Sequence, residues 1–198
     1  MLIRPRRNRV SSTIRNMVKE TILRPSNLIY PLFLVDGESI KIEVKSLPGN
    51  YRWSLDLLLG EISECISLGI KSFVLFPAVD DRHKNSTATY SYNDNNFYLK
   101  AIKTIKQQFP EVCLMSDVAM DPYSSDGHDG LVRDGKILND ETLPILGKMA
   151  VAQAEAGIDI DWRTSGDVDR MLRQTVRVVQ CLVAPHMIGS SALPSALR

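Results

Sequence analysis

The stretch VCLMSDVAMDPYSSDGHDG (residues 112–130) joins a short apolar run to a long acidic loop. The apolar run ends at Asp117, and three further aspartates and a histidine follow within the next dozen residues. A short apolar run is typical of a buried strand, and a carboxylate at the carboxyl end of a barrel strand is more often functional than structural. The stretch therefore predicts a parallel strand that carries a candidate site at its carboxyl end.

Working outward, strand-like and helix-like segments alternate along the chain. Other apolar runs are LIYPLFLV (28–35), SFVLFPAV (72–79) and IDI (158–160), the last being only the start of a strand. All three predict strands, and the continuous run 28–35 predicts a strand that is covered on both faces. Segments with helical spacing lie between them, after Ser54 up to Gly69, from Phe97 to Phe109 before Pro110, and from Asn139 or Asp140 to Gly157.

This alternation predicts an α/β fold with a parallel sheet. Long loops follow the second and third strands, at the end of the sheet that holds the active site in such folds. A (β/α)8 TIM barrel fits best, and a doubly wound sheet is the alternative. A full barrel typically needs about 250 residues, so residues 27–160 account for only about its first half.

Residues 1–26 differ in composition from residues 27–160 and are predicted to form an N-terminal arm. They hold the basic cluster RPRRNR and then Ile14, Met17, Val18 and Ile22 at helical spacing, which predicts a short amphipathic helix after Ser11 or Ser12. The arm is either solvated or packed on another subunit. A nucleic-acid surface is disfavoured, because the cluster is short and lacks interleaved aromatic residues.

Composition sets further bounds. The 198 residues carry a formal net charge of +1, which favours no charged partner. No apolar run is long enough to span a bilayer, and the N-terminus lacks the apolar core of a signal peptide, so we expect a cytoplasmic protein without a membrane partner. Three widely spaced cysteines, Cys65, Cys113 and Cys181, are expected to be reduced thiols.

The pattern breaks after residue 160. Residues 1–160 contain ten lysines and nine arginines, whereas residues 161–198 contain five arginines and no lysine. The second segment also lacks glutamate and has Trp162 as its only aromatic residue apart from histidine. Because local and global signals normally agree in a natural sequence, we interpret 161–198 as an aberrant tail from a shifted reading frame or a truncation. The alternative is an unusual C-terminal extension.

The acidic loop favours a hard cation over zinc. Oxygen ligands suit Mg²⁺, which keeps several waters and needs few carboxylates. Zinc sites favour cysteine or histidine, and this loop offers only His128. Asp126-Gly127 and Asp129-Gly130 are also ordinary turn dipeptides, so a solvated turn without a ligand is an equal alternative on composition alone.

Several motifs, in order, resemble the porphobilinogen synthase (5-aminolevulinate dehydratase) family over residues 3–160. They are RPRRNR, LIYPLFLVDG, SLPG, LFPAV, SDVAMDPYSSDGHDG and LNDET. The resemblance implies a (β/α)8 barrel with an N-terminal arm that wraps a neighbouring barrel, giving a homo-octamer in most members. The implied reaction is a hydro-lyase reaction, in which two molecules of 5-aminolevulinate condense to porphobilinogen in tetrapyrrole (haem) biosynthesis.

The resemblance also assigns expectations to the loop. Zinc-dependent members hold zinc with three cysteines, whose positions are taken here by Ala119, Asp121 and Asp129. This replacement resembles the magnesium-responsive branch, so Asp121 and Asp129 are expected to bind Mg²⁺ or the substrate amine. Asp117 matches an aspartate beside the substrate, and its charge suits an ammonium group. Ser124 matches a further family position, to which no role is assigned.

The same resemblance implies that this chain lacks the catalytic nucleophiles. Family members use two lysines in the C-terminal half of the barrel, each of which forms a Schiff base with 5-aminolevulinate. No lysine follows Lys148 here, and Lys136 and Lys148 are expected on a loop and a helix. We therefore expect the chain to be inactive, and expect it to leave an open barrel edge.

Two other functions compete with this one. The chain can be a non-catalytic fragment that associates with full-length subunits. An unrelated alternative is a magnesium-dependent phosphoryl-transfer enzyme that uses Asp117 and Asp121, but the sequence has no glycine-rich phosphate loop of the required spacing.

Overall fold

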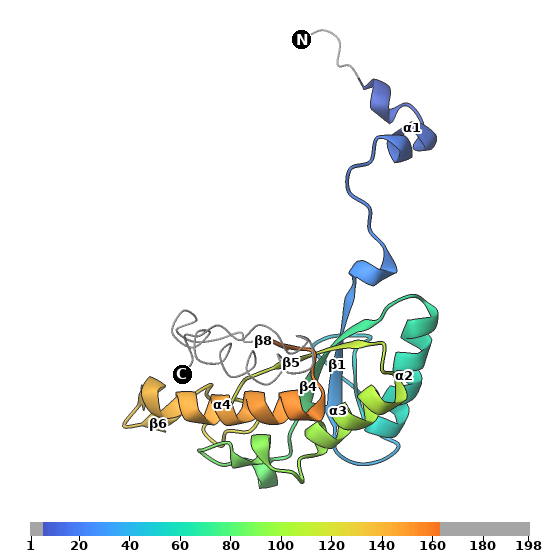
Figure 1. Ribbon diagram of the computed structural model, residues 1–198. Coiled ribbons are helices and arrows are strands. Elements are labelled where there is room, and N and C mark those ends of the chain that lie inside the picture. Colours follow the sequence, from blue (N-terminus) through green and yellow to red (C-terminus); the bar gives the residue numbers. More distant parts are fainter. Residues whose placement is uncertain (1–5, 163–198) are drawn as a thin grey trace, which may run out of the picture.

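The computed structural model describes residues 6–162, which form a mainly parallel sheet, a helical layer and an N-terminal arm (Figure 1). The sheet has six strands in the order β2-β3-β1-β4-β5-β8. In chain order these are β1 (Ile29–Val35), β2 (Lys41–Glu43), β3 (Tyr51–Trp53), β4 (Ser72–Ala78), β5 (Cys113–Asp117) and β8 (Ile160–Trp162). Within this sheet the β2–β3 pair is antiparallel and the other pairs are parallel.

Three longer helices connect the parallel strands. They are α2 (Leu55–Ser67), α3 (Phe97–Gln108) and α4 (Asn139–Ala156). Asn96 begins α3 by accepting a hydrogen bond from the amide of Tyr98, and Gly157, in the left-handed region at φ 109°, ends α4. The short elements are α1 (Ser12–Met17), the 3₁₀ turns η1 (Arg7–Arg9), η2 (Pro25–Asn27), η3 (Asp81–His83) and η4 (Thr89–Tyr92), and the hairpin strands β6 (Val132–Arg133) and β7 (Lys136–Ile137).

The strand order separates the two predicted folds. β1, β4, β5 and β8 lie side by side in the order in which they occur along the chain. This is the winding of a barrel, whereas a doubly wound sheet reverses direction from a central strand. The TIM-barrel prediction is confirmed, with part of the barrel present among the described residues.

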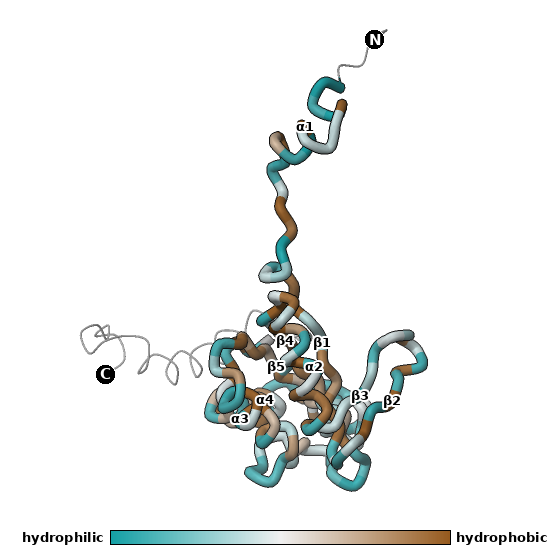
Figure 2. The backbone as a smooth tube through the Cα atoms, turned by 90° about the vertical axis from the view of Figure 1, so that its right-hand side faces the viewer, coloured by the Kyte–Doolittle hydropathy of each residue, from teal (hydrophilic) through white to brown (hydrophobic). Residues whose placement is uncertain are grey.

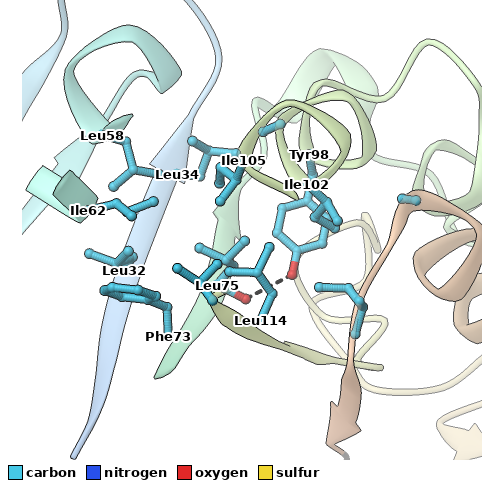
Figure 3. Close-up of a cluster of buried hydrophobic side chains, with 14 of the residues drawn as sticks. Leu32, Leu34, Leu58, Ile62, Phe73, Leu75, Tyr98, Ile102, Ile105 and Leu114 are labelled. Carbon is cyan, nitrogen blue, oxygen red and sulfur yellow. Dashed lines mark hydrogen bonds between the residues drawn. The ribbon is translucent and has the colours of Figure 1, made fainter. Parts of the chain in front are cut away.

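The main core lies between one face of the sheet and helices α2 and α3. Alternate strand residues point into it, and Tyr98 of α3 donates a hydrogen bond from its hydroxyl to the carbonyl of Leu75 at 2.9 Å (Figure 3). The most deeply buried strand members of this core are Leu32, Leu34, Phe73, Leu75 and Leu114, all at most 1% exposed, and Trp53 of β3 joins them at 7%. This burial supplies most of the stability of the sheet–helix contact.

The other face of the sheet is less covered than the sequence predicts. Only Leu32 and Leu34 of β1 are buried, and Phe33 lies half-buried on the opposite face, where its ring stacks on that of Phe76 at 5.6 Å. The prediction that β1 is covered on both faces is therefore wrong for the described residues. The physical reason is that a barrel covers its inner face only when further strands close around it.

The arm stands away from this body. Residues 6–28 run outward from the start of β1, and α1 lies at the far end of the described segment (Figure 2). The helix is capped by Ser11, whose hydroxyl accepts the amide of Ile14 at 3.2 Å, and it ends at Met17, before the predicted Ile22. Apolar side chains are exposed along the arm, including Met17 at 80% and Leu23 at 72%.

Two hairpins were not predicted. β2 and β3 form an antiparallel pair at one edge of the sheet, with the Lys41 ammonium 4.4 Å from the ring centre of Tyr51 and 4.2 Å from that of Trp53. β6 and β7 form a second pair within the loop after β5. Within residues 6–162, none of the helices is both long and apolar enough to cross a membrane.

Candidate active site

The acidic loop leaves the sheet at Asp117, the last residue of β5. Two hydrogen bonds from α4 hold this end of the strand. The Ser116 hydroxyl donates to Oε1 of Gln153 at 2.8 Å, and Nε2 of Gln153 donates to the backbone carbonyl of Asp117 at 3.3 Å. Because successive side chains of a strand alternate between faces, Ser116 faces the helices and Asp117 faces the inner side of the sheet, where it is partly buried.

The loop then folds back so that Asp129 contacts the first residues of the loop. Oδ1 of Asp129 accepts hydrogen bonds from the amides of Met120 at 3.0 Å and Asp121 at 3.3 Å. The side chains of Asp121 and Asp129 also interact through a hydrogen bond and through charge. Residues that are eight positions apart in the sequence thus form a carboxyl pair beside the end of β5.

This crowding changes the acidity of Asp121. Partial burial of its carboxyl raises the pKa to about 6, with further contributions from the charge and hydrogen bond of Asp129 and from the charge of Asp117. Like charges that share a site favour one bound proton or a bound cation. The charges of the three predicted aspartates, Asp117, Asp121 and Asp129, therefore act on one another. They lie at the carboxyl end of a barrel strand.

A further carboxyl, that of Asp161 in β8, lies at the same end of β5. Asp161 Oδ1 lies 2.6 Å from the Ser116 hydroxyl, and burial raises the pKa of Asp161 to about 6, against the lowering effect of that hydrogen bond. The hydroxyl carries a single proton, and both Gln153 Oε1 and Asp161 Oδ1 lie where they can accept it.

The Asp129→Asn variant is expected to lower the pKa of Asp121 from about 6 towards its ordinary value of 3.8, because it removes a neighbouring charge. In the unmodified chain the raised pKa favours the folded state below about pH 4, and this contribution is lost as the pH rises through 6. NMR titration of the side-chain carboxyl carbons measures the shift directly. The pH-stability curve between 4 and 6 should flatten in the variant; an unchanged Asp121 pKa would contradict the carboxyl pair.

Neighbouring segments hold the loop in place. Asn85 lies in the loop after β4. Its backbone N–H donates to the carbonyl of Tyr123 at 3.1 Å, and its backbone carbonyl accepts from the amide of Ser125 at 3.2 Å. Ser124 is buried, and its hydroxyl accepts a hydrogen bond from the amide of Asp126. This contact lies within the turn itself. His128 and Asp126 are exposed in this turn, which agrees with the turn alternative for these two residues only.

Lys136 and Lys148 lie outside the six-stranded sheet. Lys136 is exposed in β7 of the β6–β7 hairpin, which lies within the predicted loop. Lys148 lies on α4 as predicted, with its ammonium 5.4 Å from the ring centre of Tyr92. A shallow hollow surrounds this contact, lined by Tyr92, Gly147, Lys148, Val151, Ala152 and Glu155, and it includes none of the three aspartates.

The donor set fits a hard cation better than zinc. Asp121 and Asp129 offer carboxylate oxygens, and a cation between them would relieve the repulsion that raises the Asp121 pKa. Within residues 6–162, however, no group of three or more histidine, cysteine, aspartate or glutamate side chains is arranged to hold a metal. Two carboxylates with waters satisfy Mg²⁺, whereas zinc would lack its usual nitrogen or sulfur ligands.

Sequence reasoning missed Gln153 and Ser116. Both are buried polar side chains, Gln153 at 1% exposure and Ser116 at 0%. The signal for Gln153 was present, because a glutamine one turn after Met149 and Ala150 falls on the apolar face of its helix. A buried amide needs partners, and the nearest polar groups are those at the end of β5.

Comparison with known proteins agrees with this geometry. The family model described as delta-aminolevulinic acid dehydratase matches residues 2–179. The chain belongs to the delta-aminolevulinic acid dehydratase family. The match reaches beyond residue 160, where the motif resemblance ends; residues 163–198 of the predicted tail, Cys181 among them, lie outside the described residues.

Two members of the dehydratase family match this chain over less than half of their own length. The delta-aminolevulinic acid dehydratase of Chlamydia pneumoniae is 47% identical over 157 residues, which are 79% of this chain and 47% of that protein. The Bacillus subtilis dehydratase is 46% identical, over 79% of this chain and 48% of that protein. The chain thus spans about half the length of these relatives.

A solved dehydratase structure shares the fold. The crystal structure of delta-aminolevulinic acid dehydratase (porphobilinogen synthase) from Toxoplasma gondii, in complex with the reaction product porphobilinogen, superposes with a TM-score of 0.81 and 37% identity. The superposition covers 98% of this chain and 62% of that one. The sequence-derived family and its barrel fold are confirmed.

Proposed function

We propose that the protein to which these residues belong is a porphobilinogen synthase, which condenses two molecules of 5-aminolevulinate in tetrapyrrole biosynthesis. The observation that carries the proposal is the cluster of Asp117, Asp121 and Asp129 at the carboxyl end of β5, in a chain of the dehydratase family. The chain spans about half of its relatives, so the activity belongs to the whole protein.

In this proposal the acidic cluster recognises the ammonium group of 5-aminolevulinate. Asp117 faces the inner side of the sheet, where a substrate in a barrel would lie. Its charge, with that of the Asp121–Asp129 pair, makes a negative potential that attracts a cationic amine and repels a bare carboxylate. The amine would thereby be oriented against the sheet, with the ketone and carboxylate ends pointing away from β5.

A Mg²⁺ ion is the proposed cofactor, held by Asp121 and Asp129. When bound it would supply positive charge that stabilises both carboxylates in the ionised form. The residues themselves contribute the geometry, because Asp129 is fixed by two backbone amides and Asp121 is held beside it. Zinc is not proposed, since the loop has no cysteine.

The Schiff-base chemistry lies outside this chain. It has no lysine after Lys148, and Lys136 and Lys148 lie on the β6–β7 hairpin and on α4, outside the six-stranded sheet. We therefore propose that the chain alone forms no porphobilinogen. The alternative function is a non-catalytic fragment that associates with full-length subunits, for which the exposed apolar arm is the supporting observation.

The arm also supports a proposed homo-oligomer. Its apolar residues, such as Met17 and Leu23, have no cover within residues 6–162, and a second barrel would bury them. A homo-octamer is the form proposed by family resemblance, and a cytoplasmic location is proposed with it. No nucleic-acid or membrane partner is proposed.

The Asp117→Asn variant is expected to lose most of the preference of the chain for 5-aminolevulinate over levulinate. The two ligands share the ketone and the carboxylate, and only the first carries an ammonium group. Removing one charge near that group should weaken 5-aminolevulinate binding about tenfold, the scale of a charge-assisted hydrogen bond, and leave levulinate unchanged. NMR titration with each ligand gives both dissociation constants.

The matched control is Asp126→Asn, which removes the same charge from an exposed turn of the same loop. It should keep the preference. If Asp126→Asn and Asp117→Asn weaken 5-aminolevulinate binding equally, the loop acts only through its total charge, and the assignment of Asp117 is wrong.

A further inference from the structure

Gln153 is a buried amide whose two ends both contact the last two residues of β5. Its side chain is 1% exposed on α4, and an amide in such a place needs a donor and an acceptor partner. It accepts from the Ser116 hydroxyl at 2.8 Å and donates to the Asp117 carbonyl at 3.3 Å. One side chain of α4 therefore holds the end of the strand through both of its polar atoms.

The position of this contact along the strand gives it a special role. The pairing of β5 with β4 ends at Ser116, opposite Leu75, so Asp117 lies one residue beyond that ladder. On the other side of β5, Asp117 still pairs with Trp162 of β8. Towards β4, whose pairing with β5 has ended, Pro77, two residues after Leu75, has no N–H to offer the Asp117 carbonyl. Gln153 supplies a bond at this point, from the helix layer, on the face opposite to the Asp117 carboxyl.

We propose that Gln153 is a positioning residue, which fixes the backbone of Asp117 and thereby aims its carboxylate at the ammonium group of the substrate. The substrate part of this inference rests on the proposed function; the geometric part does not. Since a carboxylate selects its partner by direction as well as by charge, an Asp117 carboxylate whose direction is less well defined would bind the amine less well.

Ser116 acts with Gln153 in this arrangement. Its hydroxyl bonds to the oxygen of the amide, which leaves the nitrogen pointing to the Asp117 carbonyl. An amide rotated by half a turn would place oxygen against oxygen at that carbonyl, so the two contacts together select one orientation of Gln153. The helix is thus linked to two successive residues of the strand.

The first test measures the Asp117 side chain without any ligand. In the unmodified chain, three-bond couplings that report the Asp117 χ1 angle should show a single rotamer. Gln153→Met keeps the length of the side chain and removes both hydrogen bonds, and its couplings should become averaged over rotamers. The matched control is Ser54→Ala, which removes a buried hydroxyl bonded to Ile40 at 2.9 Å and lies three strands from β5.

The second test is a double-mutant cycle on 5-aminolevulinate affinity. Gln153→Met should weaken binding about fivefold, within the range of coupling between neighbouring residues. In the Asp117→Asn background the same change should have no further effect, because the carboxylate that Gln153 orients is gone. A residue that only stabilises the fold would weaken binding by the same factor in both backgrounds.

The outcomes separate this inference from the proposed function. Unchanged Asp117 couplings in Gln153→Met, or couplings changed equally in Ser54→Ala, overturn the positioning role whatever the ligand does. Averaged couplings in a chain that binds no 5-aminolevulinate support the positioning of Asp117 and overturn the proposed function. Additive losses in the double-mutant cycle overturn the link between Gln153 and substrate binding.

Discussion

The Phe73→Ala variant is expected to lose about 3–5 kcal/mol of unfolding free energy, the usual cost of truncating a fully buried phenylalanine. Phe73 is 0% exposed in the core between the sheet and helices α2 and α3. The truncation removes the transfer energy of the ring and leaves a cavity that the close-packed neighbours cannot fill. Chemical denaturation followed by far-UV circular dichroism gives the free energy.

Phe76→Ala is the control for that variant, because it changes the same residue type on the same strand. Phe76 lies on the half-covered inner face, where Phe33 is its stacking partner. Its truncation should cost about half as much or less, in proportion to the area removed from water. Equal losses for the two variants would show that the inner face is as well covered as the helix face, against the description of an open half-barrel.

The Asp159→Ala variant is expected to lose about 2–3 kcal/mol, because its carboxylate serves two buried or partly buried donors. Oδ2 accepts from the amide of Leu114 at 2.8 Å and from the ammonium of Lys106 at 2.9 Å. Lys106 also donates to the carbonyl of Val112 at 2.9 Å. One carboxylate thus joins α3, the start of β5 and the start of β8.

Glu111→Ala provides the comparison, since it removes an exposed carboxylate next to the same strand. Such a surface change normally stays within about 0.5 kcal/mol. Thermal unfolding of the two variants side by side gives the difference. If Asp159→Ala is no less stable than Glu111→Ala, the contact is an ordinary surface ion pair and does not hold the layers together.

Much of the fold follows from apolar periodicity. The runs that became β1 and β4 were bounded to within a residue, because glycine, proline or polar residues surround them. The helix α4 was also placed correctly, with Gly157 as its end. The hairpin of β2 and β3 was missed, because three-residue strands such as KIE carry too little pattern to be distinguished from loop.

The partial cover of β1 could not be read from its own residues. Pro31, Phe33 and Val35 are apolar in the sequence whether or not further strands cover them, since the pattern reflects a closed barrel. The helix α1 ends before Ile22 for a related reason, as a short helix on an isolated arm has no packing surface to extend it.

The candidate site was predicted in part. Asp117 could be placed because the apolar run that predicts the strand ends there. Locating the end of a strand from such a run needs no knowledge of tertiary contacts. The pairing of Asp121 with Asp129 depends on how the loop returns, which is fixed by the amides of Met120 and Asp121 and not by spacing. Gln153 lies far from the loop in sequence, so only the helix–strand packing shows its contact with Asp117.

The most direct test of the central claim is the ratio of the dissociation constants of 5-aminolevulinate and levulinate on the unmodified chain, measured by NMR titration above pH 6. The account predicts that the chain binds 5-aminolevulinate about tenfold more tightly than levulinate or better, because the aspartates at the end of β5 pair with its ammonium group. Equal affinity for the two ligands, or no binding of either, would contradict the assignment of this acidic cluster as the amine-recognition site.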